Sequence, residues 1–211
     1  MIEVKNVNLV IEKKTILEDV SLTVNPGRIV GLIGRNGSGK TMLMKCICGF
    51  IKPTSGEITV DGKRIGKDVD FPESLGVIIE TPGFIPYYSG FRNLKLLAGL
   101  NKKADDAAVK ASISKLGLDP ESRKHVGKYS LGMKQRLAIA QAIMEDQQLL
   151  ILDEPMNGLD KEGVIDVRKI LLEEKERGKT ILISSHSAED IAFLCDEVYS
   201  MEKGRIQREE K

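Results

Sequence analysis

The sequence lacks any run of about eighteen apolar residues, which is the length that a transmembrane helix needs. We therefore expect that this chain does not span a membrane by itself. Its amino end, Met1 to Asn6, also lacks the basic segment followed by an apolar segment that marks a secretory signal. Both absences favour a protein that acts on the cytoplasmic side of a membrane or in the cytoplasm.

Neither sign of charge dominates, since 32 basic residues accompany 31 acidic residues and the formal net charge is +1. Nucleic-acid-binding surfaces are normally rich in Lys and Arg, so we expect no nucleic-acid partner. The cysteines Cys46, Cys48 and Cys195 have neither the spacing of a zinc site nor that of a disulfide framework. Cys46 and Cys48 lie in an apolar helical stretch, where we expect them to pack as reduced thiols.

Hydropathy patterning predicts one α/β core interrupted by helices. Val20–Val24 alternates between apolar and polar residues, as a half-buried strand does, and turn residues follow it at Asn25–Gly27. Uniformly apolar runs, typical of strands covered on both faces, occur at Ile29–Ile33, Leu149–Leu152 and Thr180–Ile183. From about Phe91 to Asp146, apolar residues recur at helical spacing. We expect a single domain over 1–211 with a helical insertion.

A glycine-rich loop joins the first buried strand to a helix and satisfies the pattern G-x-x-x-x-G-K-[ST]. Glycines lack a Cβ atom, so several backbone N–H groups can approach a polyphosphate closely. The helix that follows adds its positive amino-terminal end. We expect Lys40 to reach the β- and γ-phosphates of ATP and the Thr41 hydroxyl to help hold Mg²⁺. The residues expected to bind the nucleotide here are Gly34, Arg35, Asn36, Gly37, Ser38, Gly39, Lys40 and Thr41.

Two acidic residues, Asp153 and Glu154, follow the apolar run Leu149–Leu152. Open α/β sheets bind ligands at the carboxyl ends of their strands. We expect Asp153 to hold Mg²⁺, mostly through water, and Glu154 to orient and partly deprotonate the water that attacks ATP. A helix N-cap with a dipole-stabilising acid is the alternative. The phosphate loop upstream favours Mg²⁺-dependent ATP hydrolysis.

The order of further motifs resembles the nucleotide-binding subunit of an ATP-binding cassette (ABC) transporter. Tyr129–Arg136 is similar to the signature stretch of that family, Asn157–Asp160 occupies the place of its D-loop, and Ser184–His186 ends a strand where the family has its switch histidine. The resemblance extends from the first strands to Ile206.

This resemblance implies a P-loop NTPase, RecA-like core with an N-terminal antiparallel β subdomain and an inserted helical subdomain. The core would comprise about 1–86 and 147–211, and the helical subdomain about 87–146. A second ABC ATPase subunit would pair with the first head to tail around two ATP molecules.

Four residues acquire roles from the resemblance alone. Ser130 and Gly132 of one copy would face the γ-phosphate bound by Lys40 of the other, although an ordinary Ser-capped helix is the alternative for this stretch. His186 would contact the γ-phosphate and the attacking water. Asp160 would communicate across the dimer.

The sequence departs from the commonest family pattern at several positions. Glu80 stands where a Gln usually contacts Mg²⁺, and its segment Ile79–Phe84 resembles the branch that exports antimicrobial peptides such as bacitracin and lantibiotics. We expect Glu80 to remain a metal and coupling contact; a solvated acidic loop residue is the alternative. No aromatic residue lies near Ile11, where the family stacks a ring on adenine, so we expect only a modest preference for ATP over GTP. Leu131 and Met133 replace the common Gly and Gln of the signature.

Four aromatic residues crowd together just after Glu80, namely Phe84, Tyr87, Tyr88 and Phe91. In the family this region borders the groove that receives the membrane subunit. Aromatic clustering suits such an interface and equally suits a local core beneath a long loop.

The leading functional hypothesis is an ATPase that powers a transporter made by other chains, with export of peptides, antimicrobials or other small molecules favoured. Its partners would be separate transmembrane subunits, and it would sit at the cytoplasmic face of a bacterial cell membrane. A soluble, non-transport ABC ATPase of the assembly-scaffold type is the runner-up. A nucleotide-sensing module without turnover is a third class, which the presence of Glu154, His186 and Asp160 disfavours.

Overall fold

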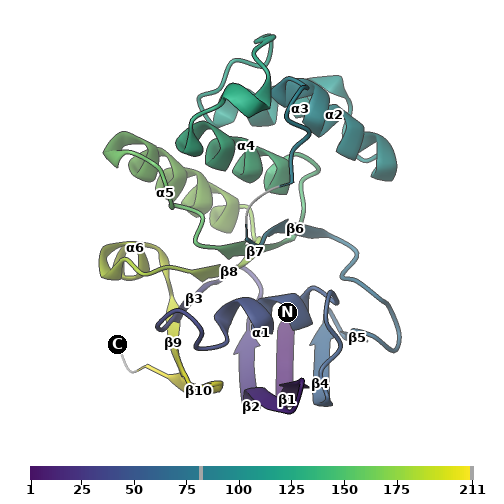
Figure 1. The fold of residues 1–211 in the computed structure, drawn as a ribbon, viewed down its shortest axis with the longest axis vertical. Helices are drawn as coiled ribbons and strands as arrows, with labels where there is room; N and C mark the ends of the chain where they lie inside the picture. Colours follow the sequence, from purple (N-terminus) through teal and green to yellow (C-terminus); the bar gives the residue numbers. More distant parts are fainter. Residues whose placement is uncertain (81–82, 210–211) are drawn as a thin grey trace.

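The computed structural model describes residues 1–80 and 83–209, and it places two sheets and a set of helices in layers (Figure 1). Thr81 and Pro82, from the segment that follows Glu80, lie outside the described residues. The larger sheet is six-stranded, with the order β10-β9-β3-β8-β7-β6, and the smaller is four-stranded, with the order β2-β1-β4-β5. The predicted α/β fold is therefore confirmed, including its N-terminal antiparallel sheet.

The smaller sheet is built by local alternation. It contains β1 Ile2–Ile11, β2 Lys14–Val24, β4 Ser55–Val60 and β5 Lys63–Arg64, and β1 pairs antiparallel with both β2 and β4. In β2 the predicted pattern is confirmed, because Val20, Leu22 and Val24 are buried whereas the residues between them are exposed.

The larger sheet contains the uniformly apolar runs. Its strands are β3 Ile29–Ile33, β6 Leu75–Ile78, β7 Leu149–Asp153, β8 Thr180–Ser184, β9 Glu197–Glu202 and β10 Arg205–Arg208. From β9 through β3, β8 and β7 to β6, neighbouring strands pair in parallel, and β9 and β10 form an antiparallel closing hairpin. Parallel sheets need cover on both faces, which explains the continuous hydrophobicity of these strands.

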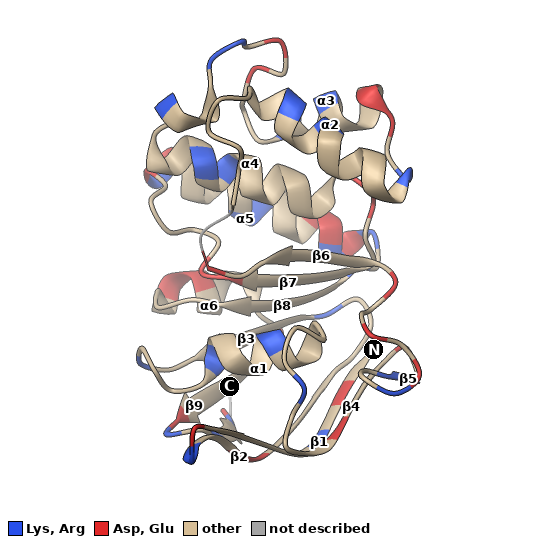
Figure 2. Ribbon diagram, turned by 45° about the vertical axis from the view of Figure 1, so that its right-hand side comes forward, with Lys and Arg blue, Asp and Glu red and all other residues tan. Residues whose placement is uncertain are grey.

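Helices supply this cover. They are α1 Lys40–Ile47, α2 Gly90–Asn101, α3 Asp106–Lys115, α4 Leu131–Ile143, α5 Lys161–Glu176 and α6 Ala188–Leu194, with a short 3₁₀ helix at Val126–Lys128. Figure 2 shows α4 and α5 on one side of β6, β7 and β8, with α1 on the other side, between the two sheets. Both faces of β7 are covered. Leu150 and Leu152 pack on the side of α4 and α5, whereas Leu149 and Ile151 pack on the side of α1 and the smaller sheet.

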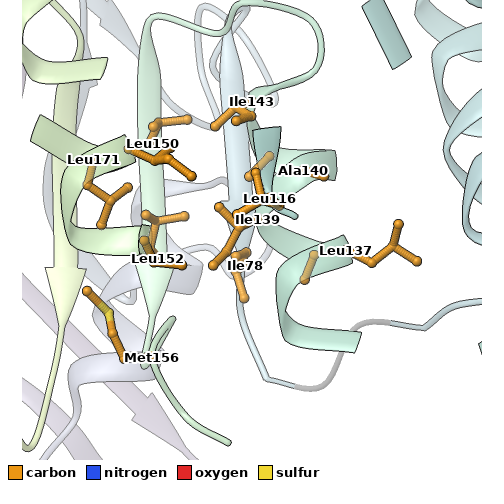
Figure 3. Packing of buried hydrophobic residues seen from close by; sticks show 14 of the residues in the cluster. Ile78, Leu116, Leu137, Ile139, Ala140, Ile143, Leu150, Leu152, Met156 and Leu171 are labelled. Atoms are coloured by element: carbon orange, nitrogen blue, oxygen red, sulfur yellow. The ribbon is translucent and has the colours of Figure 1, made fainter. Parts of the chain in front are cut away.

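The contact of α4 with the sheet is close (Figure 3). Ile139 and Ile143 of α4 lie in the same buried cluster as Ile78 of β6 and Leu150 of β7. A Cβ atom added at Gly76 of β6 would lie 1.9 Å from the carbonyl oxygen of Ala142, so only glycine permits this approach.

The thiols of α1 have the packing role expected of them. Cys46 and Cys48 are fully buried, and burial raises the pKa of Cys46 to about 11 and that of Cys48 to about 12. Thiols with such high pKa values stay protonated and unreactive at neutral pH.

The aromatic cluster divides between core and surface. Phe84 and Phe91 pack against the helical core, whereas Tyr87 is 64% exposed and its ring lies 4.9 Å from that of Tyr88. The local-core interpretation therefore applies to Phe84 and Phe91, and the interface interpretation stays a prediction for the exposed Tyr87. Throughout residues 1–80 and 83–209, no helix combines the length and the apolar character needed to cross a membrane.

Candidate nucleotide site

The phosphate loop lies at the carboxyl end of β3 and leads directly into α1. Its three glycines have positive φ, with 145° at Gly34, 78° at Gly37 and 113° at Gly39. A Cβ atom at Gly34 would lie 2.3 Å from the carbonyl oxygen of Met201, so a side chain cannot be accommodated there. At Gly37 nothing lies within 4 Å of an added Cβ, and the backbone is open to a ligand.

The Lys40 side chain stabilises the conformation of the loop. Its side chain is buried, and its Nζ donates hydrogen bonds to the carbonyl oxygens of Gly34 at 2.6 Å and Arg35 at 3.3 Å. The buried hydroxyl of Ser38 has no hydrogen-bond partner in the described part of the chain. A buried donor without a partner is a group that a bound anion can satisfy, so the loop fits a phosphate.

Asp153 lies at the centre of a short hydrogen-bonded cluster. The hydroxyl of Thr41 donates to Asp153 Oδ2 at 2.6 Å, and the hydroxyl of Ser184 donates to Asp153 Oδ1 at 2.5 Å. The same Ser184 oxygen accepts the backbone N–H of Glu154 at 2.9 Å. The sequence interpretation gave Ser184 no role beyond ending a strand. Its register opposite Asp153, on the neighbouring strand, is the signal that could have indicated one.

Glu154 and His186 contact each other directly. His186 Nε2 lies 2.9 Å from Glu154 Oε1, and the backbone N–H of His186 donates to Glu154 Oε2 at 3.3 Å. Glu154 itself has a left-handed backbone, with φ of 50°. Burial raises the pKa of Glu154 above its ordinary value, although the neighbouring His186, through its ring and its backbone N–H, and the charge of Lys40 oppose this rise. A carboxylate with a raised pKa is a stronger base.

A pocket of about 300 Å³ collects most of the predicted residues. Its walls include Asn36, Gly37, Ser38, Gly39, Lys40, Thr41, Met42, Asp153, Glu154 and His186. Lys14 and Ile16 of β2 also line it, and the sequence interpretation missed both. The expected adenine position, Ile11, belongs to the same hairpin and is 38% exposed at its tip.

Glu80, Ser130, Gly132 and Asp160 do not line this pocket. Glu80 forms an ion pair with Lys45 of α1, with 2.5 Å between Oε1 and Nζ. Ser130 caps α4 by accepting the N–H of Met133 at 3.2 Å.

The other two positions support the starts of helices. Asp160 caps α5 by accepting the N–H of Gly163 at 2.8 Å. A Cβ atom at Gly132 would lie 2.9 Å from the carbonyl oxygen of Gly158, so the start of α4 packs tightly on the loop that precedes α5.

The oxygen atoms of Thr41 and Asp153 suit a hard cation such as Mg²⁺, which proteins hold through one or two carboxylates together with phosphate and water. Over the described ranges no group of three or more His, Cys, Asp or Glu side chains is arranged to hold a metal. A cation at this site would therefore need further oxygen ligands from outside the chain, as a nucleotide phosphate provides.

A glycine loop between a buried strand and a helix, an embedded lysine, and an acid pair at the end of a second parallel strand of the same sheet define a P-loop nucleotide-binding protein. The chain belongs to the ABC transporter family, whose profile, described as "ABC transporter", matches residues 17–157. Within that family it is an ATP-binding subunit.

Curated relatives are similar over the whole chain. An uncharacterized ABC transporter ATP-binding protein, YybJ of Bacillus subtilis, is 50% identical over 100% of this chain and 97% of its own length. The bacitracin transport ATP-binding protein BcrA of Enterococcus faecalis is 40% identical over 99% of this chain and 68% of its own. The lantibiotic transport ATP-binding protein SrtF of Streptococcus pyogenes is 35% identical over 98% of this chain and 89% of its own. The predicted resemblance to the bacitracin and lantibiotic branch is confirmed.

Solved structures show the same fold. The ATP-binding cassette MJ0796, in a dimeric post-hydrolysis state bound to ADP and Pi, superposes with a TM-score of 0.89 at 22% identity, covering 100% of this chain and 98% of the other.

Proposed function

We propose that this chain hydrolyses Mg²⁺-bound ATP to power a transporter that exports peptides, antimicrobials or other small molecules. The observation that carries this proposal is the contact between the Glu154 carboxylate and the His186 imidazole, 2.9 Å apart in the wall of the pocket that the phosphate loop lines. The names of the bacitracin and lantibiotic relatives support export.

In this mechanism the loop positions ATP for attack. The backbone N–H groups of Asn36–Lys40 and the amino end of α1 bind the phosphates, and the Ser38 hydroxyl gains a partner. Thr41 and Asp153 would hold Mg²⁺, which neutralises charge on the phosphate oxygens. Glu154 accepts a proton from water, and His186 orients both the Glu154 carboxylate and the γ-phosphate.

A second ATPase subunit completes the site in this proposal. Ser130 and Gly132, at the amino end of α4, offer a hydroxyl and the helix terminus to the γ-phosphate bound by the other copy. Asp160, at the start of α5, lies in the loop that would meet that copy. The helical subdomain, about 87–146, carries the signature serine toward its partner.

Separate transmembrane subunits form the transport path, and this chain binds them at the cytoplasmic face of the membrane. Glu80 keeps a metal and coupling role, exchanging the ion pair with Lys45 for a contact near the nucleotide. We expect Glu80→Ala to reduce ATP turnover stimulated by the membrane subunits, with Glu80→Gln as the conservative comparison. Unchanged basal and stimulated turnover in Glu80→Ala would remove this role.

Steady-state ATP turnover with Mg²⁺ tests the proposal. Glu154→Gln should lower kcat by about 10²- to 10⁴-fold, as loss of a general base does, while the Kd for ATP stays near that of the parent. Lys40→Ala should weaken ATP binding itself. A parent protein that binds ATP without turnover, or a Glu154→Gln variant as fast as the parent, would contradict hydrolysis at this site.

Co-purification separates the transporter subunit from a soluble assembly scaffold. The intact chain, expressed in its native host, should be recovered in detergent together with a multi-span membrane protein. Recovery with soluble partners alone would favour the scaffold.

A further inference from the structure

Arg168 of α5 is a buried arginine that binds two acidic residues of α6. Its Nε and Nη2 both donate to Asp190 Oδ1, the Nε bond being 2.8 Å, and its Nη1 donates to Glu189 Oε1 at 2.8 Å. Arg168 is 8% exposed and Asp190 is 4% exposed, so this pair is largely buried. The guanidinium group also lies 5.4 Å from the ring centre of Phe193.

The second oxygen of Asp190 extends this network to the segment that contains His186. Asp190 Oδ2 accepts a hydrogen bond from the hydroxyl of Ser185 at 3.1 Å. The same Ser185 oxygen accepts the backbone N–H of Ser187 at 3.0 Å. The two residues that flank His186 are therefore joined to each other through one buried hydroxyl, and that hydroxyl is held by Asp190.

The network and the acid–imidazole pair face one pocket. A pocket of about 690 Å³ is lined by Arg168, Ser185 and Asp190 on one side, and by Glu154 and His186. His186 is the exposed member of its segment, with 48% of its side chain accessible, so its own packing does little to orient it. Its position against Glu154 depends on the backbone that the network holds.

We propose that Arg168, Asp190 and Ser185 are positioning residues that hold His186 in contact with Glu154. The proposal rests on the proposed function, in which these two side chains act on water and the γ-phosphate. None of the three touches the reacting atoms. Arg168 orients Asp190, Asp190 orients the Ser185 hydroxyl, and Ser185 closes the turn that presents the imidazole.

Stability alone does not account for this arrangement. A buried ion pair contributes little net stability, because desolvation of the two charges offsets most of their attraction. A bidentate arginine does supply geometric precision. The Arg168–Asp190 pair lies one hydrogen bond from the turn that contains His186, so its precise geometry can matter for catalysis. A misplacement of about 1 Å in a reacting group costs about 10²-fold in rate.

Kinetics of Ser185→Ala test the last link. We expect kcat to fall by about 10- to 100-fold while the Kd for ATP stays within about twofold, because binding and positioning are separate here. Ser112→Ala is the matched control, since it also removes a buried serine hydroxyl, one that donates to the carbonyl oxygen of Val109 at 2.8 Å within α3. An equal loss of kcat in Ser112→Ala would show a general structural effect and overturn the proposal.

A double-mutant cycle tests whether Ser185 acts through His186. In a His186→Ala background, Ser185→Ala should change kcat by less than about twofold, because residues that act as one unit are not additive. Effects that multiply in the double variant would overturn the proposal.

Imidazole NMR provides a readout that needs no turnover. The sequence has two histidines, His125 and His186, so the ¹⁵N signals of the His186 ring can be assigned with a His125→Gln variant. In nucleotide-free protein, Ser185→Ala and Arg168→Lys should move the His186 ring shifts, whereas Ser112→Ala should not. Arg168→Lys keeps the charge that the buried Asp190 needs and thus preserves the fold, while losing the bidentate contact.

Failure of the proposed function can be distinguished from failure of this inference. Absence of ATP turnover in the parent would refute the proposed function, and the NMR comparison would still decide whether this network positions His186. His186 ring shifts that stay unchanged in both Ser185→Ala and Arg168→Lys would overturn the inference even if the parent hydrolyses ATP.

Discussion

Ser184 serves both acidic residues of the site with one oxygen atom. It is fully buried at the carboxyl end of β8, where it donates to Asp153 and accepts from the backbone of Glu154. The hydroxyl thus links the residue suited to hold Mg²⁺ to the residue suited to activate water. Its small size leaves room for both contacts in a fully buried position.

Removing this hydroxyl should damage stability and catalysis together. Ser184→Ala leaves the Glu154 N–H without its acceptor and Asp153 Oδ1 without a donor, which should lower the free energy of unfolding by about 1–3 kcal/mol. We also expect a lower kcat, because Asp153 and Glu154 lose their shared anchor. Urea denaturation and steady-state turnover measure the two effects. Loss of stability with a parental kcat would show that the bond only supports the fold.

The wall of the nucleotide pocket leads to a prediction about base selectivity. Lys14 and Ile16 line the pocket, and Ile11 stands at the tip of the same hairpin, so no aromatic ring is available there for stacking. We expect ATP to bind only modestly more tightly than GTP in calorimetry. Ile11→Tyr should tighten ATP binding about 5- to 150-fold, since stacking on a ring contributes about 1–3 kcal/mol. A preference of several hundredfold for ATP in the parent would contradict this expectation.

Residue-level prediction from the sequence succeeds where a motif is local. Lys40, Asp153, Glu154 and His186 could be placed in one pocket because each follows a recognisable strand. Ser184 and Arg168 could not be assigned a role, because their partners are set by strand register and by the packing of α5 on α6. Such neighbours are far apart in the chain and leave no spacing pattern.

Among the elements, the close packing of β6 against α4 depends on one glycine. Gly76→Ala would place a methyl group against the Ala142 carbonyl, and we expect it to lower the free energy of unfolding by about 1–3 kcal/mol or more. Gly99→Ala is the matched control, because Gly99 lies in α2 with nothing within 4 Å of an added Cβ. That variant should gain about 0.5–1 kcal/mol from helix propensity. Equal effects in thermal or urea unfolding would contradict the packing argument.

Asp196 precedes β9 and binds residues of α5 and β3, and its contribution to the stability of the fold should depend on pH. Burial alone would raise the pKa of Asp196, but hydrogen bonds from Lys175 at 2.6 Å and from the N–H of Ile29 at 2.8 Å outweigh burial and hold that pKa below its ordinary value. A lowered pKa in the folded state means that ionised Asp196 stabilises the fold above the unfolded pKa of about 3.9 and loses this effect as pH falls below it.

Asp196→Asn should therefore be less stable than the parent at pH 7, and the difference in unfolding free energy should narrow below about pH 4. Urea denaturation between neutral and acidic pH measures this difference. Lys175→Met removes a main partner and should reproduce most of the loss at neutral pH. A difference in unfolding free energy that is constant with pH would show that the charge of Asp196 is not responsible for the loss of stability.

The helices and strands that could be predicted from the sequence are those whose patterns are local. The apolar runs of β3, β7 and β8 and the glycine loop before α1 indicated their structures directly. The pairing of β4 with β1 could not be deduced, because Ile58 and Val60 find their partners more than fifty positions away. The position of α1 between the two sheets likewise depends on packing between distant parts of the chain.

At the scale of the whole molecule, the parallel strands of the larger sheet bring the parts of the site together. The phosphate loop, the acid pair and the His186 segment come from widely separated parts of the chain, yet they follow the carboxyl ends of three adjacent strands, β3, β7 and β8. The amino end of α4 lies outside that pocket and caps itself with Ser130. In the proposed function this helix terminus, set apart from the phosphate loop of its own chain, would meet the nucleotide of another copy.

This arrangement predicts dimerisation that depends on ATP. Glu154→Gln should keep ATP uncleaved and elute with twice the mass of the single chain in light scattering, whereas the nucleotide-free protein should be a monomer. Ser130→Asp, added to that variant, would place a negative charge against the γ-phosphate of the other copy, and repulsion at close range should prevent the dimer while each chain still binds ATP. Ser114→Asp on the exposed face of α3 adds the same charge away from α4 and should leave the dimer intact. If the Ser130→Asp variant dimerises as readily as the Ser114→Asp variant, the signature serine does not face the partner's nucleotide, and the head-to-tail arrangement would have to be replaced by one in which α4 lies outside the interface.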